Sequence, residues 1–149
     1  MRQLEETRKP KVLPAETFWR EMAFYESGPG LWKAIHVGLS AVFFFRMANL
    51  LGLREGALAE MLSIKLSMRR RWSKSGQLSR TESDLLYRIA EVFRDSLSLF
   101  EGDVSSAIMW LRTPATALNQ IQPAALLTTH VGINLVKAHI GRIEHGVVG

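Results

Sequence analysis

One stretch of the sequence, LSRTESDLLYRIAEVFRDSLSLFEGD at residues 78–103, limits the possible folds more than any other. Its apolar residues recur every three or four positions, which is the period of an α-helix with one buried face. Ser79 and Glu82 have the spacing of a capping box, which predicts the helix start, and Gly102 predicts its end. The face expected to point into the core consists of Leu85, Leu86, Ile89, Val92, Phe93, Leu97 and Phe100.

The rest of the chain also has helical periodicity, with no alternating strand pattern and no internal repeat. Asp103 is a favourable N-cap for a helix that Pro114 ends, and Pro123 suits a first helical position. The predicted fold class is therefore all-α. Besides the long helix, we expect helices at residues 16–26, 40–51, 55–62, 66–74, 104–112 and 129–145, and a short one after Pro123.

The composition fits a globular protein that is stabilised by packing alone. With 149 residues and 47% hydrophobic content, the chain can form one compact domain or two small ones. It contains no cysteine, which excludes disulfides and thiolate metal sites. The most apolar stretch, VGLSAVFFF, is much shorter than a membrane span, and the start of the chain lacks the apolar core of a secretory signal. We therefore expect a cytoplasmic protein with no membrane association.

The positive charge is concentrated in the middle of the chain. Residues 46–80 contain eight Lys and Arg against two Asp and Glu, whereas the segments on either side are nearly balanced. A basic segment of this kind is typical of a surface that binds a polyanion. The alternative is a solvated helix face beside an acidic neighbour.

The basic segment also has the pattern of a helix-turn-helix. Two short helices are separated only by residues 63–65, and Ala59 is the small residue expected where they cross. The alternative is a plain helical hairpin with a basic face, because Ser63 replaces the usual glycine and Arg69 replaces an apolar side chain. The candidate DNA-binding residues are Lys65, Ser67, Arg69, Arg70, Arg71 and Lys74.

No feature of the sequence indicates an enzyme, a cofactor or a metal site. The four histidines, His36, His130, His139 and His145, do not have the i, i+4 spacing of a helical metal site. There is also no glycine-rich phosphate loop and no nucleophile motif. We therefore expect no catalytic residues, no metal and no cofactor.

Two motifs near the C-terminus are candidates for contact with a partner, and the alternative for WLRTP is a structural corner that ends a short helix. In WLRTP, Trp110 is expected to be a core or interface anchor, and Arg112 can bind the free carbonyl groups at the helix end. The chain ends in GRIEHGVVG, which combines charged residues, two valines and glycines that permit close backbone approach. The alternative for this ending is a helix end with Arg142 near its C-terminal dipole, followed by a loose tail.

These segments resemble those of the Xre/MbcA/ParS-like antitoxins. The resemblance is carried by ESDLLYRIAEVF, by LFEGD followed by WLRTP, and by GRIEHGVVG, which stand in order over residues 80–149. The chain departs from the family at Asn119 and Gln120, where most members have a glycine-rich turn. The resemblance implies an N-terminal Xre/Cro-like helix-turn-helix followed by a small helical toxin-binding domain.

It also implies partners, namely operator DNA and a cognate RES-domain toxin that degrades NAD. The tail is then expected to enter the toxin's active-site cleft, where Glu144 would pair with a cation and Arg142 with a carboxylate. The alternative is a stand-alone regulator whose C-terminal helices only dimerise. The candidate toxin-binding residues are Trp110, Arg112, Gly141, Arg142, Glu144, His145, Gly146, Val147 and Val148.

The expected division of the chain has three parts. Residues 1–39 form an N-terminal arm, residues 40–78 the helix-turn-helix region, and residues 79–149 the toxin-binding domain. The arm has Phe18, Trp19, Met22 and Tyr25 at helical spacing, more apolar surface than a first helix should expose. Self-association into a homodimer through this arm is therefore expected.

Overall fold

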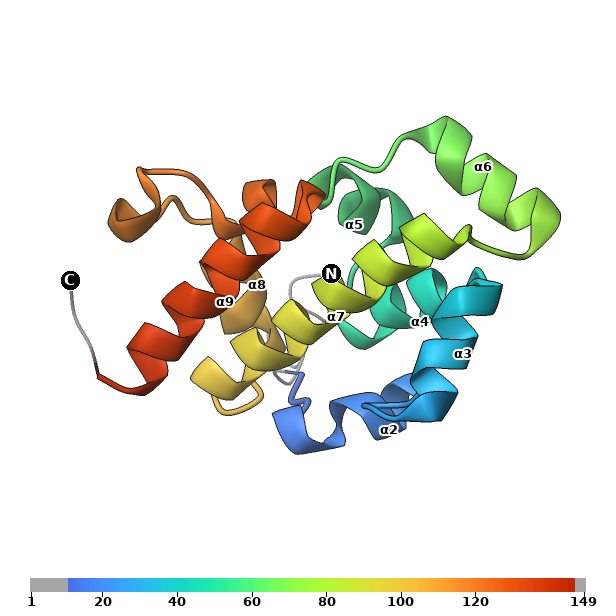
Figure 1. Cartoon of the computed structure of the whole chain (residues 1–149). Coiled ribbons are helices and arrows are strands. Elements are labelled where there is room, and N and C mark those ends of the chain that lie inside the picture. The colour runs from blue at the N-terminus through green and yellow to red at the C-terminus, as the bar shows by residue number, and fades with distance from the viewer. Residues whose placement is uncertain (1–10, 147–149) are drawn as a thin grey trace, which may run out of the picture.

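The computed structural model describes residues 11–146 and confirms the all-α fold, with no strand in that range (Figure 1). None of its helices is both long enough and apolar enough to cross a membrane. The elements are η1 (Ala15–Thr17), α2 (Phe18–Met22), α3 (Pro29–Val37), α4 (Val42–Leu50), α5 (Glu55–Met61), α6 (Leu66–Ser75), α7 (Arg80–Leu99), α8 (Val104–Leu111), η2 (Thr116–Leu118), η3 (Pro123–Thr128) and α9 (His130–Glu144).

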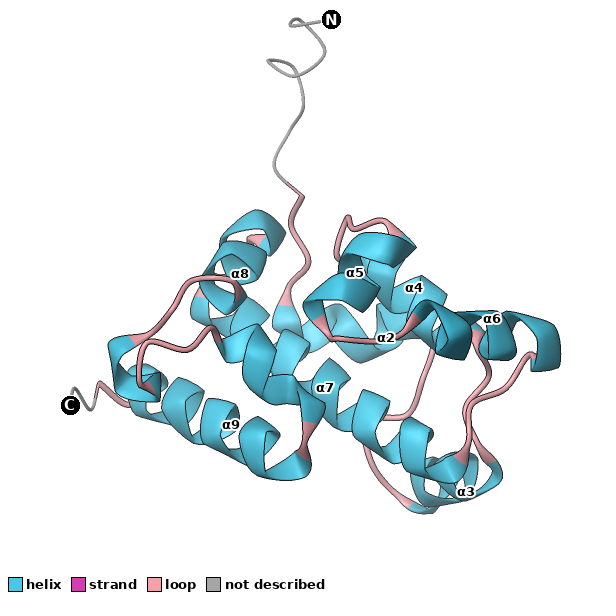
Figure 2. Ribbon diagram, turned by 90° about the horizontal axis from the view of Figure 1, so that it is seen from above, coloured by secondary structure: helices cyan, strands magenta, loops and turns pink. Residues whose placement is uncertain are grey.

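Helix α7 runs through the middle of the molecule. Helix α9 packs alongside it, from Asp84 beside His130 near its start to Ser98 beside Glu144 near its end. Helix α8 packs against its C-terminal part and α3 against its N-terminal part (Figures 1 and 2). Its predicted face is buried, with Val92, Phe93 and Leu97 fully enclosed, although Leu85 and Phe100 are only half-buried. This one helix therefore contributes to the core on both sides of the molecule.

The helix starts predicted from capping residues are confirmed. The Ser79 hydroxyl accepts a hydrogen bond from the Glu82 N–H at 3.1 Å, and the Glu82 carboxylate accepts one from the Ser79 N–H at 2.9 Å. Asp103 caps α8 by accepting from the Ser106 N–H at 3.2 Å. Pro123 occupies the first turn of η3, as expected. These bonds satisfy backbone donors that have no partner within the helix.

The N-terminal segment differs from the expected helix at residues 16–26. Helix α2 ends at Met22 because Ala23 has a positive φ of 53°, and Pro29 begins a further helix that the sequence did not predict. Phe18, Trp19 and Met22 are buried in the core of their own chain, where Trp19 stacks on Tyr87 with ring centroids 4.8 Å apart. The exposed apolar face on which the expected self-association rested is therefore absent from this helix.

The turn at Asn119 and Gln120 keeps the backbone shape of a glycine turn without glycine. Both residues have positive φ, 57° and 64° respectively. Asparagine tolerates this left-handed conformation better than most residues, whereas glutamine does so at a cost. The backbone of this turn is therefore one that glycine would adopt without strain.

Two glycines of α9 give a matched test of the packing. A Cβ on Gly132 would lie 1.8 Å from the Leu126 carbonyl oxygen, so Gly132→Ala should lower the free energy of unfolding by about 2 to 3 kcal/mol. A Cβ on Gly141 would meet no atom within 4 Å, so Gly141→Ala should raise it by about 0.5 to 1 kcal/mol. Urea denaturation of both variants measures this, and equal effects would contradict the packing of α9 on η3.

Candidate functional sites

Helix α6 presents a basic face to solvent at the edge of the molecule. Ser67, Arg70 and Lys74 are exposed at i, i+3 and i+7 spacing, which places them on one side of the helix. Lys65 is exposed at the helix start. Ser67, Arg70 and Lys74 are therefore brought together on one accessible surface, and Lys65 is accessible at the N-terminal end of the same helix.

Helix α6, which carries this basic face, is joined to the preceding helix α5 by a tight turn. Leu58, Ala59 and Leu62 of the first helix and its cap are buried, and the Ile64 N–H bonds the Ala59 carbonyl at 2.8 Å. Ser63 adopts a φ of 57°, the left-handed conformation for which glycine is usual. The turn is thus preserved despite the residue at that position.

Arg69 and Arg71 are placed differently from the other candidates. Arg69 is half-buried beside Phe45 and Glu55, and its Nε is buried with no hydrogen-bond partner in the part of the chain that the structure describes. The guanidinium of Arg71 forms an ion pair with Glu82 of α7. Neither side chain projects freely, so the basic surface is narrower than the sequence suggested.

Glu82 joins helices α6 and α7. Besides Arg71, its carboxylate accepts hydrogen bonds from the Trp72 indole N–H at 3.1 Å and from the Ser79 N–H at 2.9 Å. Burial alone would raise the pKa of Glu82, but the bonds from Arg71, Ser79 and Trp72 outweigh it and lower the pKa to about 2. The carboxylate therefore stays charged through the physiological pH range.

A second group of candidates gathers at the end of α9. Trp110 of α8 is half-buried and stacks on His139 of α9, with ring centroids 5.8 Å apart. Burial of the ring and the neighbouring charge of Arg142 lower the pKa of His139. The imidazole is therefore neutral at neutral pH, which suits its contact with the indole ring.

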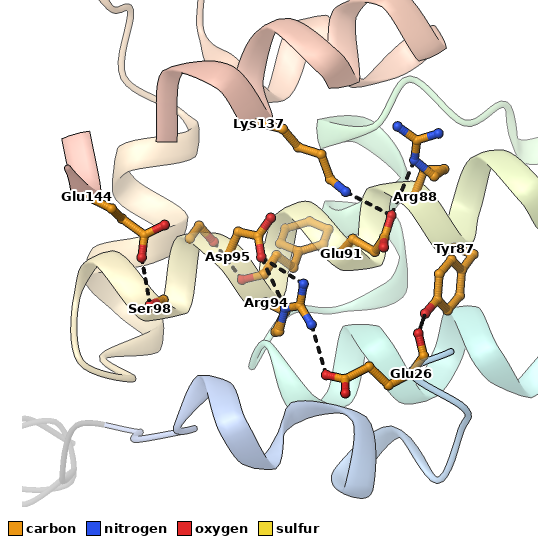
Figure 3. A network of polar contacts seen from close by, with 11 residues as sticks. Glu26, Tyr87, Arg88, Glu91, Arg94, Asp95, Ser98, Lys137 and Glu144 are labelled. Atoms are coloured by element: carbon orange, nitrogen blue, oxygen red, sulfur yellow. Dashed lines mark hydrogen bonds and ion pairs between the residues drawn. The ribbon is translucent and has the colours of Figure 1, made fainter. Parts of the chain in front are cut away.

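The last turn of α9 is tied to α7 through Glu144. The Ser98 hydroxyl donates to the Glu144 carboxylate at 3.1 Å (Figure 3). His145 contacts the Gly141 carbonyl oxygen through Nδ1 at 2.7 Å, and Gly146 ends the helix with a φ of 69°. Val147 and Val148 lie outside the described residues. Gly146 therefore has the role of a residue that ends a helix. Arg142 and Glu144, on the last turn of the same helix, remain accessible to a partner.

Two of the candidate residues, Arg112 and Gly141, have no evident structural role in the described part of the chain. The Arg112 side chain is exposed, and within residues 11–146 it makes no hydrogen bond to the carbonyls at the end of α8. The Thr113 hydroxyl binds the Met109 carbonyl instead, at 2.6 Å. At Gly141 the described residues leave open space for a side chain, so their packing does not require glycine there.

Sequence reasoning missed an exposed apolar stripe on α9. Val131 is 72% exposed and Leu135 50% exposed, and Ile143 lies further along the helix with 42% exposure. Met109 of α8 is 69% exposed. The signal was present in the sequence, because α9 has more apolar residues than the buried set Ile133, Val136 and Ile140 can account for.

The described residues contain no group of three or more His, Asp or Glu side chains that could hold a metal ion.

Comparisons with known proteins match two parts of the chain to antitoxin domains. Residues 97–146 match the model of the antitoxin Xre/MbcA/ParS C-terminal toxin-binding domain, and residues 33–91 match that of the antitoxin Xre-like helix-turn-helix domain. A protein of Photorhabdus laumondii subsp. laumondii named Antitoxin Xre is 32% identical over 132 residues, which is 87% of this chain and 89% of that protein. An Antitoxin Xre of Yersinia enterocolitica is 38% identical over 81 residues, covering 54% of this chain and 55% of that protein.

The lowered pKa of Glu82 predicts how its contribution to stability depends on pH. Because the pKa falls from its ordinary value of 4.5 to about 2 on folding, the charged form stabilises the fold above pH 4.5. This stabilisation is lost as the pH falls from about 4.5 to about 2.

The difference in unfolding free energy between wild type and Glu82→Gln should therefore be constant near neutral pH and shrink over that acid range. Urea titrations at a series of pH values measure it. Glu60→Gln, at an exposed position of α5, is the matched control. A difference that does not change with pH would contradict the role assigned to the Glu82 charge.

Proposed function

We propose that this chain, which belongs to the Xre/MbcA/ParS-like antitoxins, neutralises a cognate RES-domain toxin by covering its NAD-degrading active site. It acts in the cytoplasm as a non-catalytic inhibitor and represses its own operon through α6. The main support for toxin neutralisation is the match of residues 97–146 to a toxin-binding domain. The NAD-degrading partner is the one that the sequence resemblance implies.

The surface at the end of α9 has the chemistry that such a contact needs. Exposed apolar side chains at Leu135 and Ile143 supply area that a partner can bury. Gly141 permits close approach of a partner's backbone, because a side chain there is not needed by the fold of this chain. The proposed docking surface thus extends along α9 to its last turn.

The charges on the last turn of α9 fit the active-site cleft of an NAD-degrading toxin. A cleft that binds NAD must hold a pyrophosphate, so its walls should contain cationic and hydrogen-bonding groups. Glu144 is exposed and bound only by the Ser98 hydroxyl among the described residues, so it can pair with such a cation. Arg142 on the same turn can pair with a carboxylate of the toxin. Inhibition would then be both steric and electrostatic.

The second part of the proposal assigns operator binding to Lys65, Ser67, Arg70 and Lys74. Exposed cations on one face of a short helix attract DNA phosphates, and arginine can also read guanine in the major groove. Operators read by such helices are usually twofold symmetric, and the protein is then expected to bind them as a homodimer. The match of residues 33–91 to a helix-turn-helix model supports this assignment.

Removing the tail tests the proposed mode of inhibition. A chain that lacks residues 144–149 should still bind the toxin through α8 and the rest of α9, and the complex should degrade NAD. Binding is measured by calorimetry and NAD consumption by absorbance, each with the protein encoded by the neighbouring reading frame. The reason is that the truncation removes Glu144 and the tail from the cleft, while Arg142 and the apolar docking surface remain.

Two outcomes distinguish the alternatives. Full inhibition by the truncated chain would overturn the role of the tail. Absence of toxin binding by the intact chain would favour the stand-alone regulator whose C-terminal helices only dimerise. Ser98→Ala is the matched control, because it removes the partner of Glu144 within the chain and keeps the tail, so it should inhibit as the wild type does.

Replacing Arg70 with alanine tests the DNA-binding surface. Loss of one phosphate contact should reduce the slope of log affinity against log salt by about 1. Fluorescence anisotropy with operator DNA over a salt series measures the slope. Arg20→Ala is the matched control, because it removes one exposed cation from α2, on the opposite side of the molecule in Figure 1. An equal slope for Arg70→Ala and wild type would contradict the assignment.

A further inference from the structure

Helix α6 is attached to the rest of the molecule by few contacts. Trp72 is its one buried residue, and Figure 1 shows the helix at the edge of the molecule. A cavity of about 230 Å³ lies behind it, lined by Met68 and Trp72 of α6, by Leu85 and Ile89 of α7, and by Leu127 of η3. Apolar packing therefore leaves space beside α6 and fixes its orientation only in part.

Glu82 supplies a polar attachment at the same place. Its carboxylate accepts from Arg71 and Trp72, which are consecutive residues of α6, and from the N–H of Ser79 at the start of α7. Its side chain is only 17% exposed, so water screens these bonds weakly. Because two neighbouring α6 side chains are bound to one carboxylate, rotation of α6 about its axis would break at least one of these bonds.

The ion pair with Glu82 also affects whether the Arg71 guanidinium is available to DNA. Arg71 is 52% exposed and follows Ser67 by one helical turn, so it lies at the border of the basic face. A guanidinium already paired with a carboxylate is less available to a DNA phosphate, because it would have to exchange one anion for another. Arg70 and Lys74 have no such partner among the described residues.

We propose that Glu82 is a specificity-determining positioning residue for operator binding. It holds α6 in one orientation through Arg71 and Trp72, and it keeps the Arg71 guanidinium from DNA phosphates. This inference rests on the proposed DNA binding by α6. As a consequence, the protein lacks one sequence-independent contact with a DNA phosphate. In exchange, α6 has a fixed orientation for the contacts that recognise the operator sequence.

The variant Glu82→Gln removes the negative charge of residue 82 and keeps a hydrogen-bond acceptor at that position. Glutamine keeps an oxygen that can accept from Ser79 and Trp72, but it no longer neutralises Arg71. Binding of the variant to DNA of unrelated sequence should tighten roughly three- to tenfold at about 0.1 M salt, with the salt slope steeper by about 1. The ratio of operator affinity to unrelated-DNA affinity should fall. A residue that only stabilises the fold would weaken binding to both DNAs and would not steepen the slope.

The variant Arg71→Ala provides an independent test. Because Arg71 does not contact phosphate in the wild type under this proposal, its removal should leave the salt slope unchanged, whereas Arg70→Ala reduces it. Anisotropy titrations with operator and unrelated duplexes are compared for all these proteins, with circular dichroism to confirm folding. If Glu82→Gln does not fold, the slope of Arg71→Ala decides alone.

A slope that falls by about 1 in Arg71→Ala would show that Arg71 binds phosphate in the wild type, and it would overturn the proposal. An unchanged slope in folded Glu82→Gln would also overturn it, while Arg70-dependent operator binding by the wild type would still stand. Absence of DNA binding by the wild type would instead overturn the proposed function and this inference together.

Discussion

Burial of the apolar face of α7 is the interaction on which the other contacts depend. Val92 and Phe93 are fully enclosed, and elements from both ends of the chain, η1 and α3 as well as α8 and α9, pack against this helix. Its polar side is bound as well, because Glu91 pairs with Lys137 of α9 at 2.9 Å and Arg94 pairs with Glu26 at 3.1 Å (Figure 3). A helix held on both sides in this way gives the two proposed binding surfaces one common support. The two ranges that match family models, residues 33–91 and 97–146, meet within this helix.

The course of α7 separates the two proposed binding surfaces. Helix α6 is attached near the start of α7 through Glu82, and the end of α9 is attached near its finish through Ser98 and Glu144. In Figures 1 and 2, α6 and the end of α9 lie at opposite ends of the molecule. A toxin held on the last turns of α9 would therefore leave the exposed face of α6 accessible to DNA. In this account, repression and neutralisation do not compete for the same residues.

The features that the sequence predicted best are those determined by neighbouring residues. The capping box of Ser79 and Glu82 and the N-cap Asp103 depend on residues three positions apart, so they could be recognised directly. The second partner of Glu82 could not, because Arg71 is eleven residues away and the pair forms only when α6 folds back on α7. The burial of Trp19 required Tyr87, which is still more distant in the sequence. In each case, the missing information was which helix covers which face, and periodicity alone does not give it.

In the proposed assembly, one chain holds toxin and operator at opposite ends of α7 at the same time. The most direct test is native mass spectrometry of the antitoxin mixed with the product of the neighbouring reading frame and with operator DNA. The account predicts a single assembly that contains all three components, with the toxin unable to degrade NAD. Release of the antitoxin from DNA whenever the toxin binds would contradict it, because the two surfaces would then overlap or exclude each other through a change in the fold.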